Sequence, residues 1–194
     1  MKSGYFVKVL VVFLFYSISS MNLYSQNAFS DGDNNINLGI GIGSNLGGRG
    51  FKSTLPPLSI SYERCIIDEL FDDKSSLGVG GYFGYSTSRS EFSSTVTSAK
   101  FGFNYSYLII GARGALHYHL VDKLDTYGGL MLGLNITKHS TYGNWHDFHS
   151  LPLGNTLGWS LFFGGRYYFH ENLAAFAELG YGIAFLQVGI TFKF

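Results

Sequence analysis

The sequence predicts an all-β fold, an eight-stranded antiparallel up-and-down transmembrane β-barrel. Three observations support this prediction. Only 13% of the residues are charged, 18% are aromatic and 26 are glycine, a composition that favours β structure over disorder or long helices. Apolar and polar residues alternate in eight segments, as in strands whose two faces meet different surroundings. An even number of segments, most of them about 9–11 residues long, suits tilted strands that cross a bilayer in a closed barrel.

The first 25 residues have the features of a secretory signal peptide. Two lysines give a basic start, Val9–Phe15 is a short apolar run, and a serine-rich stretch continues to Ser25. The apolar run is shorter than the about 20 residues that a membrane-spanning helix needs. We therefore expect Sec-type export with cleavage after Ser25, a short polar N-terminal lead at residues 26–34, and a barrel formed by residues 35–194.

Eight alternating segments are the expected strands. They are Ile36–Leu46, Leu58–Ile67, Leu77–Tyr85, Phe101–Leu120, Tyr127–Thr137, Leu157–Phe169, Leu173–Tyr181 and Leu186–Phe194. The connections after the first, third and fifth are long, and those after the second, fourth and sixth are short and rich in Asp, Glu and Asn. This pattern fits long outer loops and short periplasmic turns. The eighth strand is expected to pair with the first and close the barrel.

Three connections are assigned from residues that favour turns or loops. Pro56 and Pro57 are expected in the loop before the second strand, Ser86–Ala99 in a Ser/Thr-rich connection, and Asp122–Asp125 in a tight turn. Within the long fourth strand, the apolar parity changes near Tyr107–Leu108. This change predicts either a bulge or an extension above the membrane that forms an aromatic rim.

Four charged residues fall on the inward-facing parity, namely Glu63, Arg113, Arg166 and Glu178. We expect them to form an interior ion-pair network in the periplasmic half of the lumen, because two carboxylates and two guanidiniums balance and buried charge must be paired. The side chains of an eight-stranded barrel fill its interior. The sequence therefore predicts a plugged lumen, with a proton or ion path as the alternative.

The longest expected loop, Lys138–Asn155, contains Trp145, His146 and His149. Imidazoles beside Asp147 suit a transition metal, but their spacing matches no defined site. We expect no metal and no cofactor, and instead an aromatic loop that rests on the barrel rim or contacts lipopolysaccharide or another protein.

Charge and cysteine content exclude other classes of function. Basic and acidic residues are equal in number, 13 each, so there is no basic footprint for nucleic acid. Cys65 is the single cysteine, which rules out an intramolecular disulfide. A soluble lipocalin-like barrel would need its apolar residues turned inward, the reverse of the parity on which the charges fall.

The signal peptide ending in Ser-Gln and two long stretches, Tyr107–Ile136 and Glu171–Phe194, resemble small outer-membrane β-barrel proteins of the Bacteroidetes type. These are similar to OmpA/OmpX-type barrels. The resemblance covers nearly all of the mature chain and implies a monomer in the outer membrane of a Gram-negative bacterium, among outer-membrane lipids and lipopolysaccharide. It also implies that Phe192 and Phe194 form the signal read by the barrel-assembly machinery, with periplasmic chaperones as further partners. The family shares no catalytic residues, so none are assigned.

The expected function is therefore non-enzymatic, with outer loops for surface interaction or a role in envelope integrity. The alternatives are a lipid A-modifying barrel enzyme and a narrow small-solute channel. Such an enzyme needs Ser and His near a carboxylate at the outer membrane edge, and Ser140 and Ser150 with the loop histidines are the candidates, although no such arrangement faces lipid on a strand. His117 and His119 point inward and are expected to be packed and hydrogen-bonded.

Overall fold

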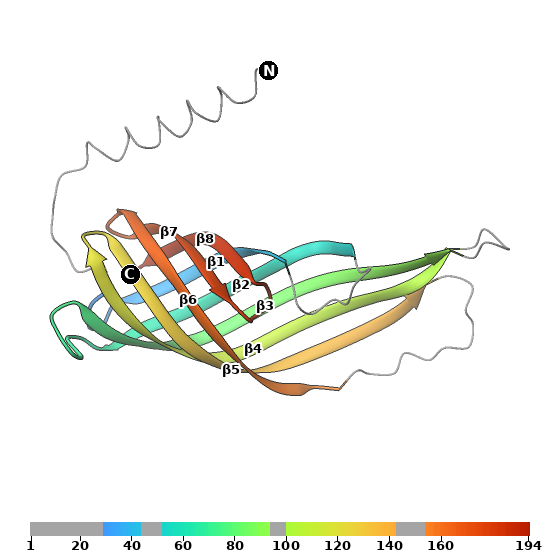
Figure 1. Ribbon diagram of the computed structural model, residues 1–194, viewed down its shortest axis with the longest axis horizontal. Helices are drawn as coiled ribbons and strands as arrows, with labels where there is room; N and C mark the ends of the chain where they lie inside the picture. The colour runs from blue at the N-terminus through green and yellow to red at the C-terminus, as the bar shows by residue number, and fades with distance from the viewer. Residues whose placement is uncertain (1–28, 44–51, 94–99, 143–153) are drawn as a thin grey trace, which may run out of the picture.

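The protein is a closed antiparallel barrel in which each strand pairs with its sequence neighbours and β8 pairs with β1. The computed structural model describes residues 29–43, 52–93, 100–142 and 154–194 (Figure 1). The strands are β1 Asn34–Ile42, β2 Lys52–Ile67, β3 Ser75–Ser93, β4 Lys100–Val121, β5 Leu124–Tyr142, β6 Thr156–His170, β7 Leu173–Gly180 and β8 Leu186–Lys193. The predicted fold class and the closing pair are confirmed. Among the described residues, no helix is long and apolar enough to span a bilayer.

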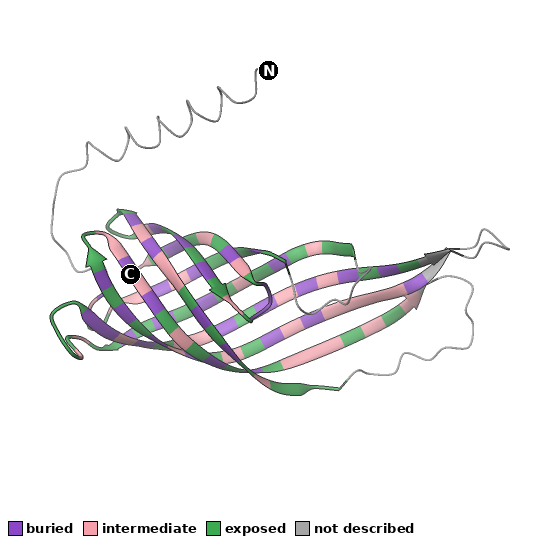
Figure 2. Cartoon of the chain, in the orientation of Figure 1, coloured by how far each residue is buried: buried purple, intermediate pink, exposed green. Residues whose placement is uncertain are grey.

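Buried and exposed residues alternate along the strands (Figure 2). The exposed rows are largely apolar, whereas the buried rows include polar and charged side chains. Along β8, Gln187 and Thr191 are buried, whereas Val188, Ile190 and Phe192 are between 41% and 47% exposed. The same outward row continues on β5 and β6, where its members are also exposed: Leu130, Leu132, Leu134, Trp159 and Leu161. Because successive side chains of a strand point to opposite faces, one register places these apolar rows outside and polar residues such as Gln187 and Thr191 inside.

The strands differ greatly in length, and the wall is therefore closed over only part of its height. β7 and β8 have 8 residues each, whereas β4 has 22. The β3–β4 ladder continues past the Tyr85–Leu108 pair as far as Ser93–Lys100. We call this projecting part of β2–β5 the extended sheet and its side of the barrel the extended end, at the right in Figure 1. The opposite side, with the β2–β3, β4–β5 and β6–β7 turns, is the turn end.

The extended sheet corrects two predicted connections. Ser86–Ser93 belongs to β3 instead of a loop, and Lys138–Tyr142 belongs to β5. The serines are compatible with a strand because Ser86 and Ser88 are buried opposite Tyr107 and Tyr105 of β4, where a small side chain leaves room for a tyrosine ring. The β3–β4 and β4–β5 pairing runs through Tyr107–Leu108 without a register shift. The parity change there therefore marks the start of the extension and involves no bulge.

Two smaller predictions of loops and turns were also wrong. Pro56 and Pro57 lie within β2, next to register shifts in the β2–β3 pairing. Proline has no N–H to donate to a β-ladder. It is tolerated here because both prolines lie at these irregularities, beyond the last β1–β2 pair at Leu58. The β4–β5 turn contains only Asp122 and Lys123, so that Asp125 lies inside β5.

The β2–β3 turn is held by side-chain hydrogen bonds around Asp72. Its carboxylate accepts from the Lys74 backbone N–H at 3.1 Å and from the Tyr118 hydroxyl at 3.1 Å, and its own N–H donates to Ser75 Oγ at 3.0 Å. Partial desolvation raises the pKa of Asp72, but hydrogen bonds from Ser75 and Lys74 outweigh it and hold the pKa below its usual value. The acidic turn is thus an ordered cap on the turn end.

Candidate functional site

Four strands bring charged side chains together in the turn-end half of the lumen. Glu63 of β2, His117 of β4, Asp125 of β5 and Arg166 of β6 are each buried to 2% exposure or less. Asp125 and Arg166 are direct cross-strand partners, which brings their side chains within reach of each other on the inner face. The inward row of each strand therefore supplies one member of the group.

These four side chains form a closed ring of charge-assisted hydrogen bonds, which we call the ionic ring. His117 bridges the carboxylates, with Nδ1 2.9 Å from Asp125 Oδ1 and Nε2 3.0 Å from Glu63 Oε1. Arg166 bridges the same two carboxylates from the other side, with Nη1 3.0 Å from Asp125 Oδ2 and Nη2 bonded to Glu63 Oε2. Every carboxylate oxygen in the ring therefore has a donor.

The geometry of the ionic ring sets the charge of the His117 imidazole. Both of its ring nitrogens face carboxylate oxygens, and an ionised carboxylate can only accept hydrogen bonds. The imidazole of His117 must therefore be protonated on both nitrogens, as an imidazolium, and donate from each of them. With Arg166 it then balances the two carboxylates, which an enclosure without water requires of buried charge.

Glycine on a neighbouring strand makes the ring sterically possible. A Cβ on Gly78 of β3 would lie 2.9 Å from Glu63 Oε1 and 3.0 Å from Glu63 Cγ. A Cβ on Gly164 of β6 would lie 2.8 Å from the Tyr127 hydroxyl oxygen. Small residues on the inward face therefore reserve the volume that the large charged and aromatic side chains occupy.

A second ion pair lies next to the ionic ring. Arg113 Nη2 of β4 is 2.7 Å from Glu178 Oε2 of β7, and both residues are buried. The Arg113 guanidinium lies 3.8 Å from the centroid of Phe162, a distance typical of a cation–π contact. The Tyr127 ring separates the two groups, with its centroid 4.4 Å from the Arg166 guanidinium carbon and 6.0 Å from that of Arg113.

Phe29 closes the lumen at the turn end. This fully buried residue comes before β1, and its ring centroid lies 4.4 Å from that of His117. Its backbone N–H donates to His119 Nε2 at 3.0 Å, and its carbonyl accepts from Ser76 Oγ at 3.3 Å. The aromatic ring therefore separates the ionic ring from the solvent at this end.

The extended end of the closed wall is filled differently. The connection from β7 to β8 folds inward, so that Ile183 and Ala184 are buried in one apolar cluster with Tyr82, Ile109 and other residues. We call this inward-folded connection, residues 181–185, the apolar plug. It lies on the extended-end side of the Arg113–Glu178 pair. The lumen is therefore filled by charged groups toward the turn end and by apolar groups toward the extended end.

All four charged residues singled out in the sequence lie inside the lumen, but they belong to two groups. Glu63 is bonded to Arg166, and Arg113 is bonded to Glu178. The balance of two carboxylates against two guanidiniums was incomplete, because Asp125 adds a third carboxylate and His117 a third cation. Parity had already placed His117 inward, although not in this network, and it indicates Asp125 as well, since Asp125 shares the inward row of Tyr127. Phe29 lies outside any alternating segment and left no such signal.

Two further sets of residues were singled out in the sequence. Trp145, His146 and His149 fall outside the described residues. Within the described ranges, no group of three or more His, Cys, Asp or Glu side chains is arranged to hold a metal ion. Phe192 and Phe194 point outward at the turn end and are exposed, and the Phe194 backbone exchanges two hydrogen bonds with Asn34, of 3.1 and 3.0 Å.

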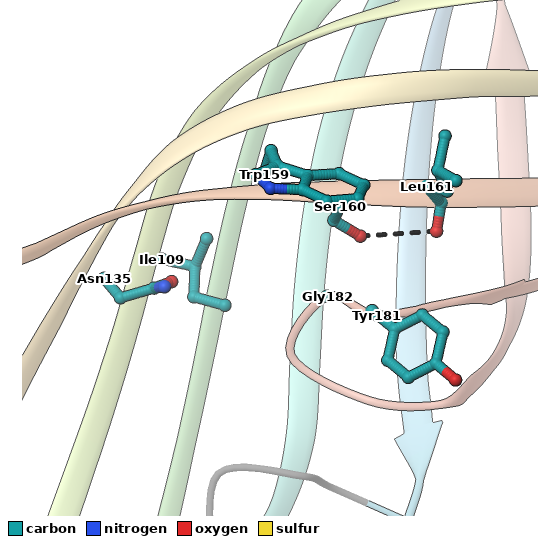
Figure 3. Close-up of a pocket in the computed structure, with 7 residues that line it drawn as sticks. All are labelled: Ile109, Asn135, Trp159, Ser160, Leu161, Tyr181 and Gly182. Atoms are coloured by element: carbon teal, nitrogen blue, oxygen red, sulfur yellow. Dashed lines mark hydrogen bonds between the residues drawn. The ribbon is translucent and has the colours of Figure 1, made fainter.

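A pocket of about 400 Å³ lies between β6 and the apolar plug. Figure 3 shows its lining, with three successive residues of β6 on one side and the loop after β7 on the other. The lining residues are Ile109, Asn135, Trp159, Ser160, Leu161, Tyr181 and Gly182. A much smaller space of about 10 Å³, room for about one water molecule, shares Ser160 and Gly182 with it and reaches Arg113 and Glu178.

Together, the fold and the interior define a closed eight-stranded barrel with an apolar exterior and a filled, charged lumen. No family model and no curated protein matches the chain. Several solved structures of outer-membrane proteins are similar to the chain over most of its length.

One is Ail, the attachment invasion locus protein of Yersinia pestis, in complex with the heparin analogue sucrose octasulfate (14% identity, 84% of this chain, 99% of that chain, TM-score 0.47). Another is the outer membrane protein OprG from Pseudomonas aeruginosa (14% identity, 86% and 97% coverage, TM-score 0.48). A third is the N-terminal β-barrel domain of Pseudomonas aeruginosa OprF (18% identity, 84% and 98% coverage, TM-score 0.39). At these identities the likeness concerns the fold alone.

Proposed function

We propose that the protein is an integral outer-membrane barrel of a Gram-negative bacterium. The observation that supports this most strongly is the distribution of polarity, with apolar rows such as Val188, Ile190 and Phe192 outside and the ionic ring inside. A water-soluble barrel would expose that apolar belt to solvent at about 25 cal/mol for each Å². In a bilayer the belt contacts acyl chains, and closure of the wall pairs the backbone groups that lipid cannot satisfy.

The proposed orientation follows from the two ends of the barrel. Short turns such as Asp122–Lys123 lie at the turn end, and short turns face the periplasm in outer-membrane barrels. The extended sheet then projects from the outer surface, and the aromatic residues Phe192 and Phe194 lie in the periplasmic girdle. We propose that these two residues are read by the barrel-assembly machinery after Sec-type export and signal-peptide cleavage, and that the mature protein is a monomer.

The proposed role is non-enzymatic, as a surface-contact or envelope-stabilising protein. The extended sheet supports it, because its strands carry polar groups beyond the apolar belt, such as Arg89 of β3, which donates to Asn104 Oδ1 of β4 at 2.8 Å. The chain from β5 to β6 passes through Trp145, His146 and His149, so these residues connect strands of the extended end. We propose that they contact lipopolysaccharide or another macromolecule at the cell surface.

A filled lumen disfavours the channel alternative. The ionic ring, the Arg113–Glu178 pair and the apolar plug occupy successive levels of the lumen, and Phe29 covers the turn end. A small-solute channel needs a continuous water path along the lumen, and these groups would have to move out of the lumen to open one. The lipid A-modifying alternative has no comparable observation in its favour.

Four measurements test the proposal. The protein should leave cell envelopes only with detergent, and its folded form should migrate differently on gels from a boiled sample. Extraction by high salt or alkaline carbonate without detergent would contradict the membrane assignment. Altered acylation of lipid A in a deletion strain would overturn the non-enzymatic role, and rapid solute entry in a liposome-swelling assay would overturn the filled lumen.

A further inference from the structure

The pocket beside β6 lies in the wall of the barrel, not along its axis. Trp159, Ser160 and Leu161 are consecutive in β6, so their side chains alternate between the two faces of the sheet. Trp159 and Leu161 are 68% and 57% exposed on the outside, whereas Ser160 is buried on the inside. A pocket lined by all three can only run along the edge of the strand, from the outer face to the inner one.

The edge is free because β7 is shorter than β6. The β6–β7 ladder ends at the Phe162–Gly180 pair, and one further bond joins the Tyr181 N–H to the Leu161 carbonyl at 3.3 Å. Within the described residues, β6 from Thr156 to Ser160 pairs with β5 alone. The inward folding of the apolar plug, with Ile183 and Ala184 buried, draws the chain away from this edge and leaves the opening that Figure 3 shows.

The lining changes in chemical character from outside to inside. Trp159, Leu161 and Tyr181 form an apolar and aromatic rim on the outer face, and Tyr181 is 68% exposed. Further in lie Ile109 and the polar side chains of Asn135 and Ser160. The Asn135 amide and the unpaired backbone N–H groups of β6 can donate to an oxygen-bearing group, whereas the rim offers aromatic faces and an aliphatic side chain that can contact hydrocarbon.

We propose that this opening is a lateral portal that admits a single acyl chain from the bilayer into the wall of the barrel. The inference rests on the proposed membrane location, because only lipid lies against the outward rim in that setting. The volume of about 400 Å³ falls in the range of small-ligand sites. The methylenes of the chain lie against Trp159, Leu161 and Ile109, and its carbonyl or carboxylate oxygens accept a hydrogen bond from the Asn135 side-chain amide, because Ser160 Oγ already donates to the Leu161 carbonyl at 3.3 Å.

The portal ends before the charged interior. Gly182 lines both the pocket and the small space next to Arg113 and Glu178. A Cβ on Gly182 would meet Tyr82 Oη at 3.7 Å, Gln187 Nε2 at 3.9 Å and Met131 Cε at 4.0 Å, all ordinary contacts. These three residues line the small space, and Ser160 and Gly182 line both spaces. A larger side chain at position 182 therefore occupies the junction between the small space and the pocket, next to Ser160.

Photo-crosslinking with mass spectrometry tests the portal in the full-length protein. The barrel is reconstituted into phosphatidylcholine vesicles in which a fraction of the lipid carries a diazirine on one acyl chain. We expect label on the inward-facing residues Ile109 and Ser160, in addition to the outward residues Leu130 and Ile190, which any bilayer-embedded barrel exposes to lipid. A parallel sample with unlabelled lipid and a free diazirine fatty acid identifies the source of the chain. Inward label from either source supports the portal.

Two variants make the test specific. Gly182→Leu should abolish the label at Ser160, which lines both spaces, and leave the label at Leu130 and Ile190 unchanged. The matched control is Gly114→Leu on the outer face, where an added Cβ meets only the Gly78 carbonyl oxygen at 3.9 Å, and it should leave both sets of labels in place. Absence of inward label in the wild type from both sources, or persistence of the Ser160 label in Gly182→Leu, would overturn the portal. Absence of label at Leu130 and Ile190 from the lipid would instead contradict the membrane location.

Discussion

The two ends of the lumen are closed by different kinds of interaction. At the turn end, the ionic ring joins four strands through charge-assisted hydrogen bonds, and Phe29 shields it. At the extended end, the apolar plug packs Ile183 and Ala184 among aromatic and aliphatic side chains. A buried ionic ring is strongly destabilised by the loss of any member, because the others keep their charge. An apolar plug loses only the contacts of the atoms removed.

The largest expected effect is that of Arg166→Met. This substitution leaves Glu63 and Asp125 buried with His117 as their only cation, and removing one partner of a buried ion pair costs about 3–5 kcal/mol. Urea-induced unfolding of the barrel in phospholipid vesicles, followed by tryptophan fluorescence and gel migration, measures the loss. Adding Glu63→Gln to Arg166→Met should recover part of it, since the remaining charges then balance. A loss below about 1 kcal/mol for the single variant would contradict a tightly coupled ring.

The next largest effect is expected for Phe29→Ala. Truncation of a buried phenylalanine costs about 3–5 kcal/mol in a closed core, and we expect about 2–3 kcal/mol here because water can enter the vacated mouth. The neighbouring Ser30→Ala is the control and should change the free energy of unfolding by less than about 0.5 kcal/mol. Equal values for the two variants in the same vesicle assay would show that the segment before β1 does not seal the ring.

A smaller loss of unfolding free energy is expected when isoleucine is replaced by valine, and its size should differ between a position inside the barrel and one outside. Ile183→Val removes one methylene from the apolar plug and should cost about 1 kcal/mol, as in other cores. Ile190→Val removes it from the outward row, where lipid refills the space, and should cost less than about 0.5 kcal/mol. Urea titration of both variants in identical vesicles gives the comparison. A greater cost at Ile190 would mean that the assignment of inner and outer faces is reversed.

The protonation state of His117 can be observed without changing the protein. If both ring nitrogens donate to carboxylates, nitrogen NMR of the folded barrel labelled with ¹⁵N-histidine should show two protonated ring nitrogens for this residue. The His117→Gln variant assigns the signal by its disappearance. A neutral tautomer at His117 would contradict the charge balance of the ionic ring.

Much of this architecture could be predicted from the sequence, because alternation reports directly on which face each residue occupies. Strand number, the β1–β8 closure and the inward placement of Glu63, Arg113, Arg166 and Glu178 all follow from parity. The strand ends were harder, since Ser86–Ser93 resembles a loop in composition and forms a strand only because β4 lies beside it. Asp125 was assigned to a turn for the same reason, although it shares the parity of Tyr127.

Other features depend on tertiary contacts that leave no periodic signal. Phe29 is a single aromatic residue in a polar lead, and only the folded barrel shows that it packs on His117. Ile183 and Ala184 lie in a short connection whose inward folding depends on space inside the barrel, where a Cβ on Gly41 would lie 2.3 Å from that of Ala184. The portal beside β6 exists because two adjacent strands differ in length, a property of pairing and not of either strand alone.

We propose that the protein spans the membrane as a barrel with a closed lumen. Single-channel recording of the purified wild-type protein in planar lipid bilayers distinguishes a closed lumen from an open one. We expect insertion, shown by protease protection of the same sample in vesicles, without conductance steps of porin size. Stable steps of porin size from the inserted wild-type protein would show that the ionic ring and the apolar plug do not close the lumen.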